Sequence, residues 1–279
     1  MSDTPDLVLL DNGSLEPAAT RSLRRIAAEL AGRLGRPVFP VSLLHSHKIP
    51  AEQLDGVAAD ILEPWLKRAL AAGRSRFLVL PLFFGPSGAL VDYLPARLAH
   101  LRQTWPRLEL TLAPCLCDAA EGGDEAILEI LADQVRAIPG GLSAGRTQVL
   151  LVDHGSPKRE VTEVRDRLAS SLAEKLGGSV AGVAAASMER RPEPEYDFNE
   201  PLLERALPAL PEGCTDVVVS LLFVSPGRHA GPGGDIATIC EAAMAACPGL
   251  RVRMTALVGE HPGLVALLAR RAIAAGRAL

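Results

Sequence analysis

Two histidines and one glutamate in the second half of the chain could carry metal and proton chemistry together. Each of them follows a short apolar segment: His154, Glu189 and His229. Imidazoles and a carboxylate bind divalent ions such as Zn²⁺, Fe²⁺, Co²⁺ or Ni²⁺ and can leave coordination positions open. The same histidines can act as bases, because imidazole titrates near neutral pH. A single histidine is more simply interpreted as a hydrogen-bonded loop residue, so the hypothesis depends on a fold that brings the three together.

Basic residues cluster beside the same positions. Arg190, Arg191 and Arg228 adjoin the glutamate and the second histidine, and Ser156 lies close to the first. Arginine matches a carboxylate through two parallel hydrogen bonds. In a chain with a formal net charge of −4, such a local basic cluster favours an anionic ligand. We therefore expect these four residues to bind a substrate with several carboxylates, and the alternative is ordinary solvated surface charge.

Alternating strands and helices must position these residues. Short apolar runs predict strands at 147–153, 180–187, 217–224 and 251–258, and helical periodicity predicts helices at 158–175, 202–210, 235–246 and 264–275. Ser156 and Asp235 are expected to cap the helices that follow them. This alternation predicts a mainly parallel sheet with helices on both faces. Ligands bind at the carboxyl ends of the strands in such sheets, so the strand-end histidines and glutamate should converge there.

The chain also repeats itself, with matching segments roughly 140 residues apart. Residues 8–14 resemble 150–156, and further matches follow in the same order. We therefore expect an α/β protein of two tandem, similar lobes, each with a four-stranded sheet. The lobes are assigned to residues 1–140 and 146–279, because the Gly-rich stretch 139–145 suits a linker.

The first lobe lacks the histidine pair. It has Asn12 and Ala89 at the corresponding positions, and neither side chain is a useful base. We therefore regard this lobe as degenerate and expect the site in the second one. By the spacing of the repeat, His47 takes the position of Glu189, and His45 lies just before it. These two histidines could form an auxiliary metal site, although a solvated loop is the interpretation we favour.

Composition narrows the function classes. The chain has 279 residues, 48% hydrophobic and 22% charged, as in an ordinary globular protein. The negative charge and an aromatic content of 4% argue against nucleic-acid binding. No segment resembles a membrane span or a signal peptide, and five cysteines without paired spacing favour a reducing cytoplasm. Cys115 and Cys117 are expected to be core or half-buried thiols, and no iron–sulfur cluster is indicated.

Several motifs of the second lobe resemble one enzyme family. They are Asp153–Ser156, Ser187–Pro192, Leu222–His229 and Asp235-Ile236. Together they resemble the class II tetrapyrrole chelatases, the sirohydrochlorin cobaltochelatases and ferrochelatases of the CbiX/SirB type, in a duplicated two-domain form. The resemblance is strong over residues 147–275 and faint but ordered over 6–137.

The resemblance implies a lyase that inserts Co²⁺, Fe²⁺ or Ni²⁺ into sirohydrochlorin or a related carboxylated tetrapyrrole without ATP, in cobalamin or siroheme biosynthesis. His154 and His229 would bind the metal and accept pyrrole protons, and Glu189 would occupy the acidic position. The metal ion is a substrate, and no organic cofactor is expected.

Two alternatives use the same groups differently. One is a non-catalytic metallochaperone or tetrapyrrole carrier on this fold. The other is a periplasmic-binding-like metal protein, which the lack of a signal peptide disfavours.

The Pro- and Glu-rich segment Glu193–Asn199 has no counterpart in the first lobe and could form a lid or alter substrate choice. Two lobes in one chain also suggest a pseudo-symmetric monomer.

Overall fold

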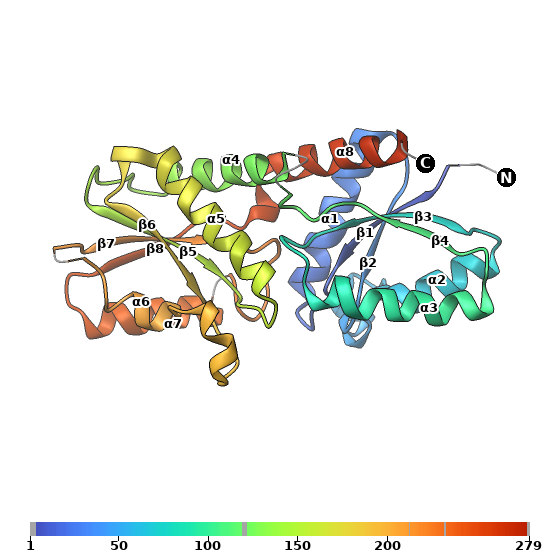
Figure 1. Cartoon of the computed structure of the whole chain (residues 1–279), viewed down its shortest axis with the longest axis horizontal. Coiled ribbons are helices and arrows are strands. Elements are labelled where there is room, and N and C mark those ends of the chain that lie inside the picture. Colours follow the sequence, from blue (N-terminus) through green and yellow to red (C-terminus); the bar gives the residue numbers. More distant parts are fainter. Residues whose placement is uncertain (1–3, 119–121, 212, 232, 278–279) are drawn as a thin grey trace. The chain divides into compact units, whose positions relative to one another are not determined.

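The computed structural model describes residues 4–118, 122–211, 213–231 and 233–277 (Figure 1). The chain forms two compact units: unit 1 comprises residues 1–123 and 262–279, and unit 2 comprises residues 124–261. Each unit therefore combines the sheet of one sequence repeat with the last helix of the other repeat. The stretch 139–145, where the sequence repeat divides, lies inside unit 2.

Unit 1 contains a four-stranded parallel sheet with the strand order β2-β1-β3-β4. Its strands are β1 (Asp6–Asp11), β2 (Val38–Ser42), β3 (Arg76–Pro81) and β4 (Glu109–Leu112), and its helices are α1 (Pro17–Leu34), α2 (Leu62–Ala71), α3 (Leu94–Thr104) and α8 (Pro262–Arg277). Figure 1 shows α2 and α3 on one face of this sheet and α1 and α8 on the other.

Unit 2 repeats this architecture with the strand order β6-β5-β7-β8. Its strands are β5 (Thr147–Asp153), β6 (Gly182–Ser187), β7 (Asp216–Leu221) and β8 (Arg251–Met254), and its helices are α4 (Gly123–Arg136), α5 (Arg159–Leu176), α6 (Leu203–Ala206) and α7 (Asp235–Ala246). Helices α6 and α7 cover one face, and α4 and α5 cover the other (Figure 1). The expected fold class, two similar α/β lobes with parallel four-stranded sheets, is confirmed.

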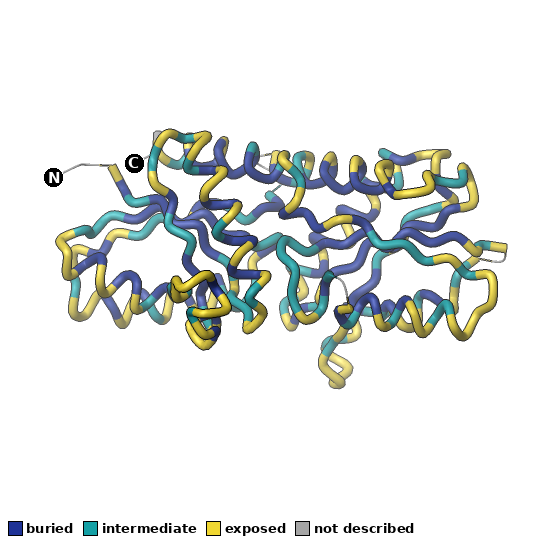
Figure 2. Tube along the Cα trace, turned by 180° about the vertical axis from the view of Figure 1, so that it is seen from behind, coloured by how far each residue is buried: buried dark blue, intermediate teal, exposed yellow. Residues whose placement is uncertain are grey.

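Burial explains why the strands are continuous apolar runs. All seven residues of β5 are buried, because the strand is central and covered by helices on both faces. Figure 2 shows the central strands of both units as buried segments. Leu222 and Val258 extend the apolar runs beyond β7 and β8 and are buried, but Leu222 lies in a loop and Val258 begins the 3₁₀ turn Val258–Glu260. The strands therefore end earlier than their apolar runs.

One helix is much shorter than its periodicity predicts. Helix α6 ends at Ala206, although apolar residues continue to Leu210. Leu207 still has helical dihedrals, with φ −62 and ψ −44, but Pro208 after it has no N–H to continue the helical hydrogen-bond ladder. Separately, no helix within the described residues is long and apolar enough to cross a membrane.

Candidate functional site at the carboxyl edge of the unit 2 sheet

His154 is the first residue after β5, and the backbone brings it next to Glu189. The following Gly155 has φ +91, and an added Cβ there would lie 1.9 Å from the carbonyl oxygen of Glu189. Only glycine fits this approach. The Glu189 N–H also donates to the His154 carbonyl oxygen at 3.1 Å. The two candidate residues are therefore neighbours through their main chains as well as their side chains.

The structure brings all three candidate side chains together. His154 Nε2 lies 3.4 Å from Glu189 Oε1. The rings of His154 and His229 meet edge to face, with centroids 4.7 Å apart and planes at 72°. The side chains of His154 and Glu189 are 47% and 57% exposed, so the cluster is open to a ligand from solvent.

Asp235 fixes the orientation of His229. Its Oδ2 lies 2.7 Å from His229 Nδ1, which assigns the proton to Nδ1 and leaves Nε2 as the acceptor. The expected helix-capping role of Asp235 is wrong, because the residue at the N-cap position is Gly234. The backbone N–H of Asp235 donates instead to the Arg228 carbonyl oxygen at 3.1 Å, and this bond folds the loop back so that the carboxylate meets the imidazole. The sequence spacing of His229 and Asp235 alone does not predict this contact.

His154 is oriented by its own turn. Its Nδ1 lies 3.1 Å from the Gly155 carbonyl oxygen, to which it donates. Nε2 is then the acceptor, and a proton taken up there would point towards the Glu189 carboxylate. Both imidazoles thus hold Nδ1 in a local hydrogen bond and keep Nε2 for a ligand or a proton.

These three residues do not form a preorganised metal cage. Within the described part of the chain, no group of three or more His, Cys, Asp or Glu side chains is arranged to hold a metal ion. The carboxylates already contact side chains of the protein: Glu189 lies beside the His154 imidazole, and Asp235 lies beside His229.

The three candidate arginines differ in their surroundings. Arg190 is 16% exposed, and its guanidinium contacts Glu200 at 2.8 Å and Asp197 at 3.0 Å. Its hydrogen bond also holds the pKa of Glu200 below its usual value. Arg190 therefore fastens the loop and is satisfied within the chain.

The other two arginines keep exposed surfaces. Arg191 contacts the Tyr196 hydroxyl at 3.1 Å and lies over that ring, 5.3 Å from its centroid. Arg228 is 78% exposed, with its Nε 3.6 Å from Asp235. These two, and not Arg190, have guanidinium groups that could meet a carboxylated substrate.

Ser156 is used inside the turn. The residue is buried, and its Oγ accepts a hydrogen bond from the Lys158 N–H at 3.0 Å. The expected N-cap role is wrong, because α5 begins at Arg159 with Lys158 at the cap position. The hydroxyl therefore stabilises the turn after His154 from within the protein.

Unit 1 shows which residue replaces the glutamate. An added Cβ at Gly13 would lie 1.7 Å from the carbonyl oxygen of Leu44, and the Leu44 N–H donates to Asn12 at 3.2 Å. Leu44 therefore occupies the position of Glu189, and the expectation that His47 does so is wrong. The extra helical turn Gly177–Ser179 in unit 2 shifts the register before the second strand.

The remaining candidates of unit 1 are peripheral or buried. His45 and His47 are exposed after β2, where His47 lies in the 3₁₀ turn Ser46–Lys48. Cys117 is buried, and burial raises the pKa of Cys115 to about 11, which keeps its thiol protonated at neutral pH. The interpretation of this pair as core or half-buried thiols is confirmed.

Comparisons with known proteins agree with this geometry. SirB from Bacillus subtilis with Fe³⁺ has a TM-score of 0.68 at 14% identity, covering 96% of this chain and 94% of that one. The sirohydrochlorin chelatase SirB from Bacillus subtilis subspecies spizizenii in complex with cobalt scores 0.65 at 15% identity, covering 98% and 96%. CbiX, described as the terminal enzyme for biosynthesis of siroheme in denitrifying bacteria, scores 0.63 at 19% identity, covering 97% and 98%. At these identities the likeness shows the fold.

Sequence comparison gives a narrower result. No curated protein sequence matches the chain. A family model described as CbiX matches residues 6–138 and again residues 148–275. These two regions include both sheets and nearly all of the chain, and the protein therefore belongs to the CbiX family.

Proposed function

We propose that this CbiX-family protein inserts Co²⁺, Fe²⁺ or Ni²⁺ into sirohydrochlorin or a related carboxylated tetrapyrrole without ATP, at the histidine pair of unit 2. The observation that carries the proposal is the edge-to-face contact of His154 and His229, with centroids 4.7 Å apart. The relatives support it, since one solved structure is a sirohydrochlorin chelatase with cobalt and another holds Fe³⁺.

The chemistry of the cluster suits this reaction. Insertion of a divalent ion into a free tetrapyrrole requires two pyrrole protons to leave. In the proposed mechanism, the Nε2 atoms of His154 and His229 meet the metal ion and the pyrrole N–H groups. Glu189 stabilises an imidazolium formed at His154, and Asp235 stabilises one formed at His229, through the contacts at 3.4 and 2.7 Å. No phosphate-binding loop follows the first strand of either repeat, in keeping with an ATP-independent reaction.

Turnover distinguishes this proposal from a carrier or metallochaperone. With protein far below the concentration of sirohydrochlorin and Co²⁺, a chelatase converts many equivalents, and the visible spectrum changes fully. A carrier changes the spectrum by one equivalent at most. A progress curve that stops at one equivalent, or that matches the protein-free rate, would overturn the proposed activity.

The exposed arginines should affect substrate binding more than chemistry. We expect Arg191→Ala and Arg228→Ala each to raise KM for a carboxylated tetrapyrrole by up to about tenfold, with kcat changed less. A guanidinium–carboxylate contact acts similarly on the ground and transition states, and uniform binding of this kind appears in KM. Steady-state kinetics against tetrapyrrole concentration would measure this.

Arg25→Ala is a suitable control for those variants. Arg25 is an exposed arginine on α1 in unit 1, paired with Glu29 at 2.8 Å. Its loss should leave KM unchanged. If Arg191→Ala and Arg228→Ala behave like Arg25→Ala, the two residues are surface charge only.

A further inference from the structure

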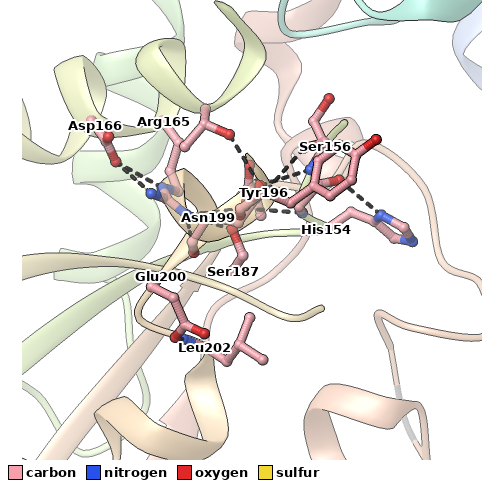
Figure 3. A network of polar contacts seen from close by, with 12 residues as sticks. His154, Ser156, Arg165, Asp166, Ser187, Tyr196, Asn199, Glu200 and Leu202 are labelled. Atoms are coloured by element: carbon pink, nitrogen blue, oxygen red, sulfur yellow. Dashed lines mark hydrogen bonds and ion pairs between the residues drawn. The ribbon is translucent and has the colours of Figure 1, made fainter. Parts of the chain in front are cut away.

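A buried amide holds the turn that carries His154. Asn199, fully buried, ends the 3₁₀ segment Pro194–Asn199 (Figure 3). Its Oδ1 accepts the Ser156 N–H at 2.9 Å, and its Nδ2 donates to the Ser156 carbonyl oxygen at 3.0 Å. The same Oδ1 also accepts a hydrogen bond from the Thr162 hydroxyl at 3.1 Å, and Nδ2 also donates to the Tyr196 carbonyl oxygen at 3.0 Å. One side chain thus binds both backbone groups of Ser156.

A buried arginine joins this amide to the ends of two strands. Arg165 of α5 is among the largest fully buried side chains of the protein. Its guanidinium donates to the Asn199 carbonyl oxygen at 3.2 Å and to the Ser187 hydroxyl, and lies 3.6 Å from Asp153 Oδ1. Ser187 in turn donates to Asp153 at 2.7 Å. The network therefore connects the residue before His154 with the end of β6, just before Glu189.

Unit 1 folds into the same sheet and the same turn without either residue. Helices α1 and α5 have equal lengths of 18 residues, and Leu23 occupies the place of Arg165. The backbone N–H of Ser14, the counterpart of Ser156, donates instead to the Ser46 hydroxyl at 3.1 Å. The fold therefore does not require the arginine or the asparagine. They occur in the unit that has the imidazoles.

We propose that Asn199 and Arg165 are positioning residues for His154, and that the segment containing Asn199 is an anchored support and not a mobile lid. The His154 imidazole is half exposed, so the backbone of its turn sets its direction. Asn199 binds that turn at Ser156, and Arg165 binds it through Asp153. The effect on turnover rests on the proposed chelatase function, whereas the effect on the ring does not.

The first test observes the ring directly. Nitrogen-15 NMR of the His154 imidazole in the full chain should give two well-separated resonances, as a fixed Nδ1–H tautomer requires. In Asn199→Ala these resonances should move towards each other as the ring samples other orientations and tautomers. Asn199→Asp keeps the acceptor for Ser156 and should remain closer to the wild type. Ser46→Ala, the matched change in unit 1, should leave the His154 resonances unchanged.

The second test uses turnover. Asn199→Ala should lower kcat about tenfold or more with KM within about twofold, because a misplaced base affects the chemical step. Arg165→Lys, which keeps a cation beside Asp153, should lose less activity than Arg165→Leu. Thermal unfolding by circular dichroism identifies variants that fail to fold.

The outcomes separate the two proposals. Unchanged His154 resonances in folded Asn199→Ala would overturn the positioning role, whatever the turnover. Altered His154 resonances together with a wild-type kcat would show that the orientation set by Asn199 does not determine the reaction rate, which would also overturn the proposal. Should the wild type not metallate any tetrapyrrole, the proposed function fails, while the NMR comparison still decides whether Asn199 orients the ring.

Discussion

His154→Ala and His229→Ala are each expected to lower tetrapyrrole metallation at least about a hundredfold, the usual loss when a positioned base is removed. Each change deletes one of the two imidazoles that meet edge to face. Neither side chain fills core volume, because His154 is half exposed and His229 lies in a loop at the strand end. Both variants should therefore keep the wild-type circular dichroism spectrum and unfolding midpoint.

Two further variants make this comparison specific. Asn12→Ala changes the counterpart of His154 in unit 1 and should retain nearly full activity, since a neutral amide contributes no basicity. Glu189→Gln should be intermediate, because it removes the carboxylate that faces His154 and keeps both imidazoles. All four would be measured by steady-state metallation. An Asn12→Ala variant as inactive as His154→Ala, or a His154→Ala variant with near-normal turnover, would mean that the site lies elsewhere.

The fold and the histidine cluster could be predicted because both depend on regular patterns. Apolar runs alternating with helical periodicity determine a parallel sheet, and such a sheet brings all carboxyl strand ends to one edge. His154, Glu189 and His229 each follow a strand, so their convergence needed no knowledge of side-chain contacts. The repeat then predicted a second sheet of the same order.

The supporting contacts could not be predicted because they depend on loops. The hydrogen bond of Asp235 to His229 arises from a loop that folds back on itself, and Asn199 reaches Ser156 from a segment without a counterpart in the repeat. The extra turn Gly177–Ser179 displaced the alignment, so that His47 was matched to Glu189 where Leu44 is the true counterpart. Loop lengths changed these positions without altering the strand pattern.

The two units also differ in how they accommodate the aspartate that ends the first strand of each sheet, which is buried in unit 2 and half-buried in unit 1. Asp153 in unit 2 has Arg165 at 3.6 Å, and burial raises its pKa while the arginine opposes that shift. In unit 1 the equivalent residue is Asp11, and Leu23 takes the helix position of the arginine. Ser42 and a backbone N–H bond its carboxylate, but within the described residues its Oδ1 has no hydrogen-bond partner. Unit 1 therefore has a leucine where unit 2 places a cation near the aspartate.

The contribution of Asp11 to the stability of unit 1 should be less favourable at neutral pH than at acidic pH. Burial raises the pKa of Asp11 from 3.8 to about 6. Below the unfolded pKa the group is protonated in both states and costs nothing. Between the two values the folded state keeps a proton that the unfolded state has released, so the free energy of unfolding decreases as pH rises. Above the folded pKa the full cost applies, on the order of 3 kcal/mol for a shift of this size.

Asp11→Asn removes that cost, and its effect should depend on pH. The free energy of unfolding of the variant relative to the wild type should increase by about 2 kcal/mol between pH 4 and pH 7, because at pH 4 the carboxyl of the unfolded chain has already lost part of its proton. Any fixed cost of burying the amide is the same at both values and cancels. Both tryptophans, Trp65 and Trp105, lie in unit 1, so their fluorescence during denaturant unfolding reports this unit. Asp55→Asn, at an exposed aspartate of the same unit, should show little pH-dependent difference. An Asp11→Asn difference that stays constant from pH 4 to pH 7 would show that the Asp11 carboxyl titrates alike in the folded and unfolded chain.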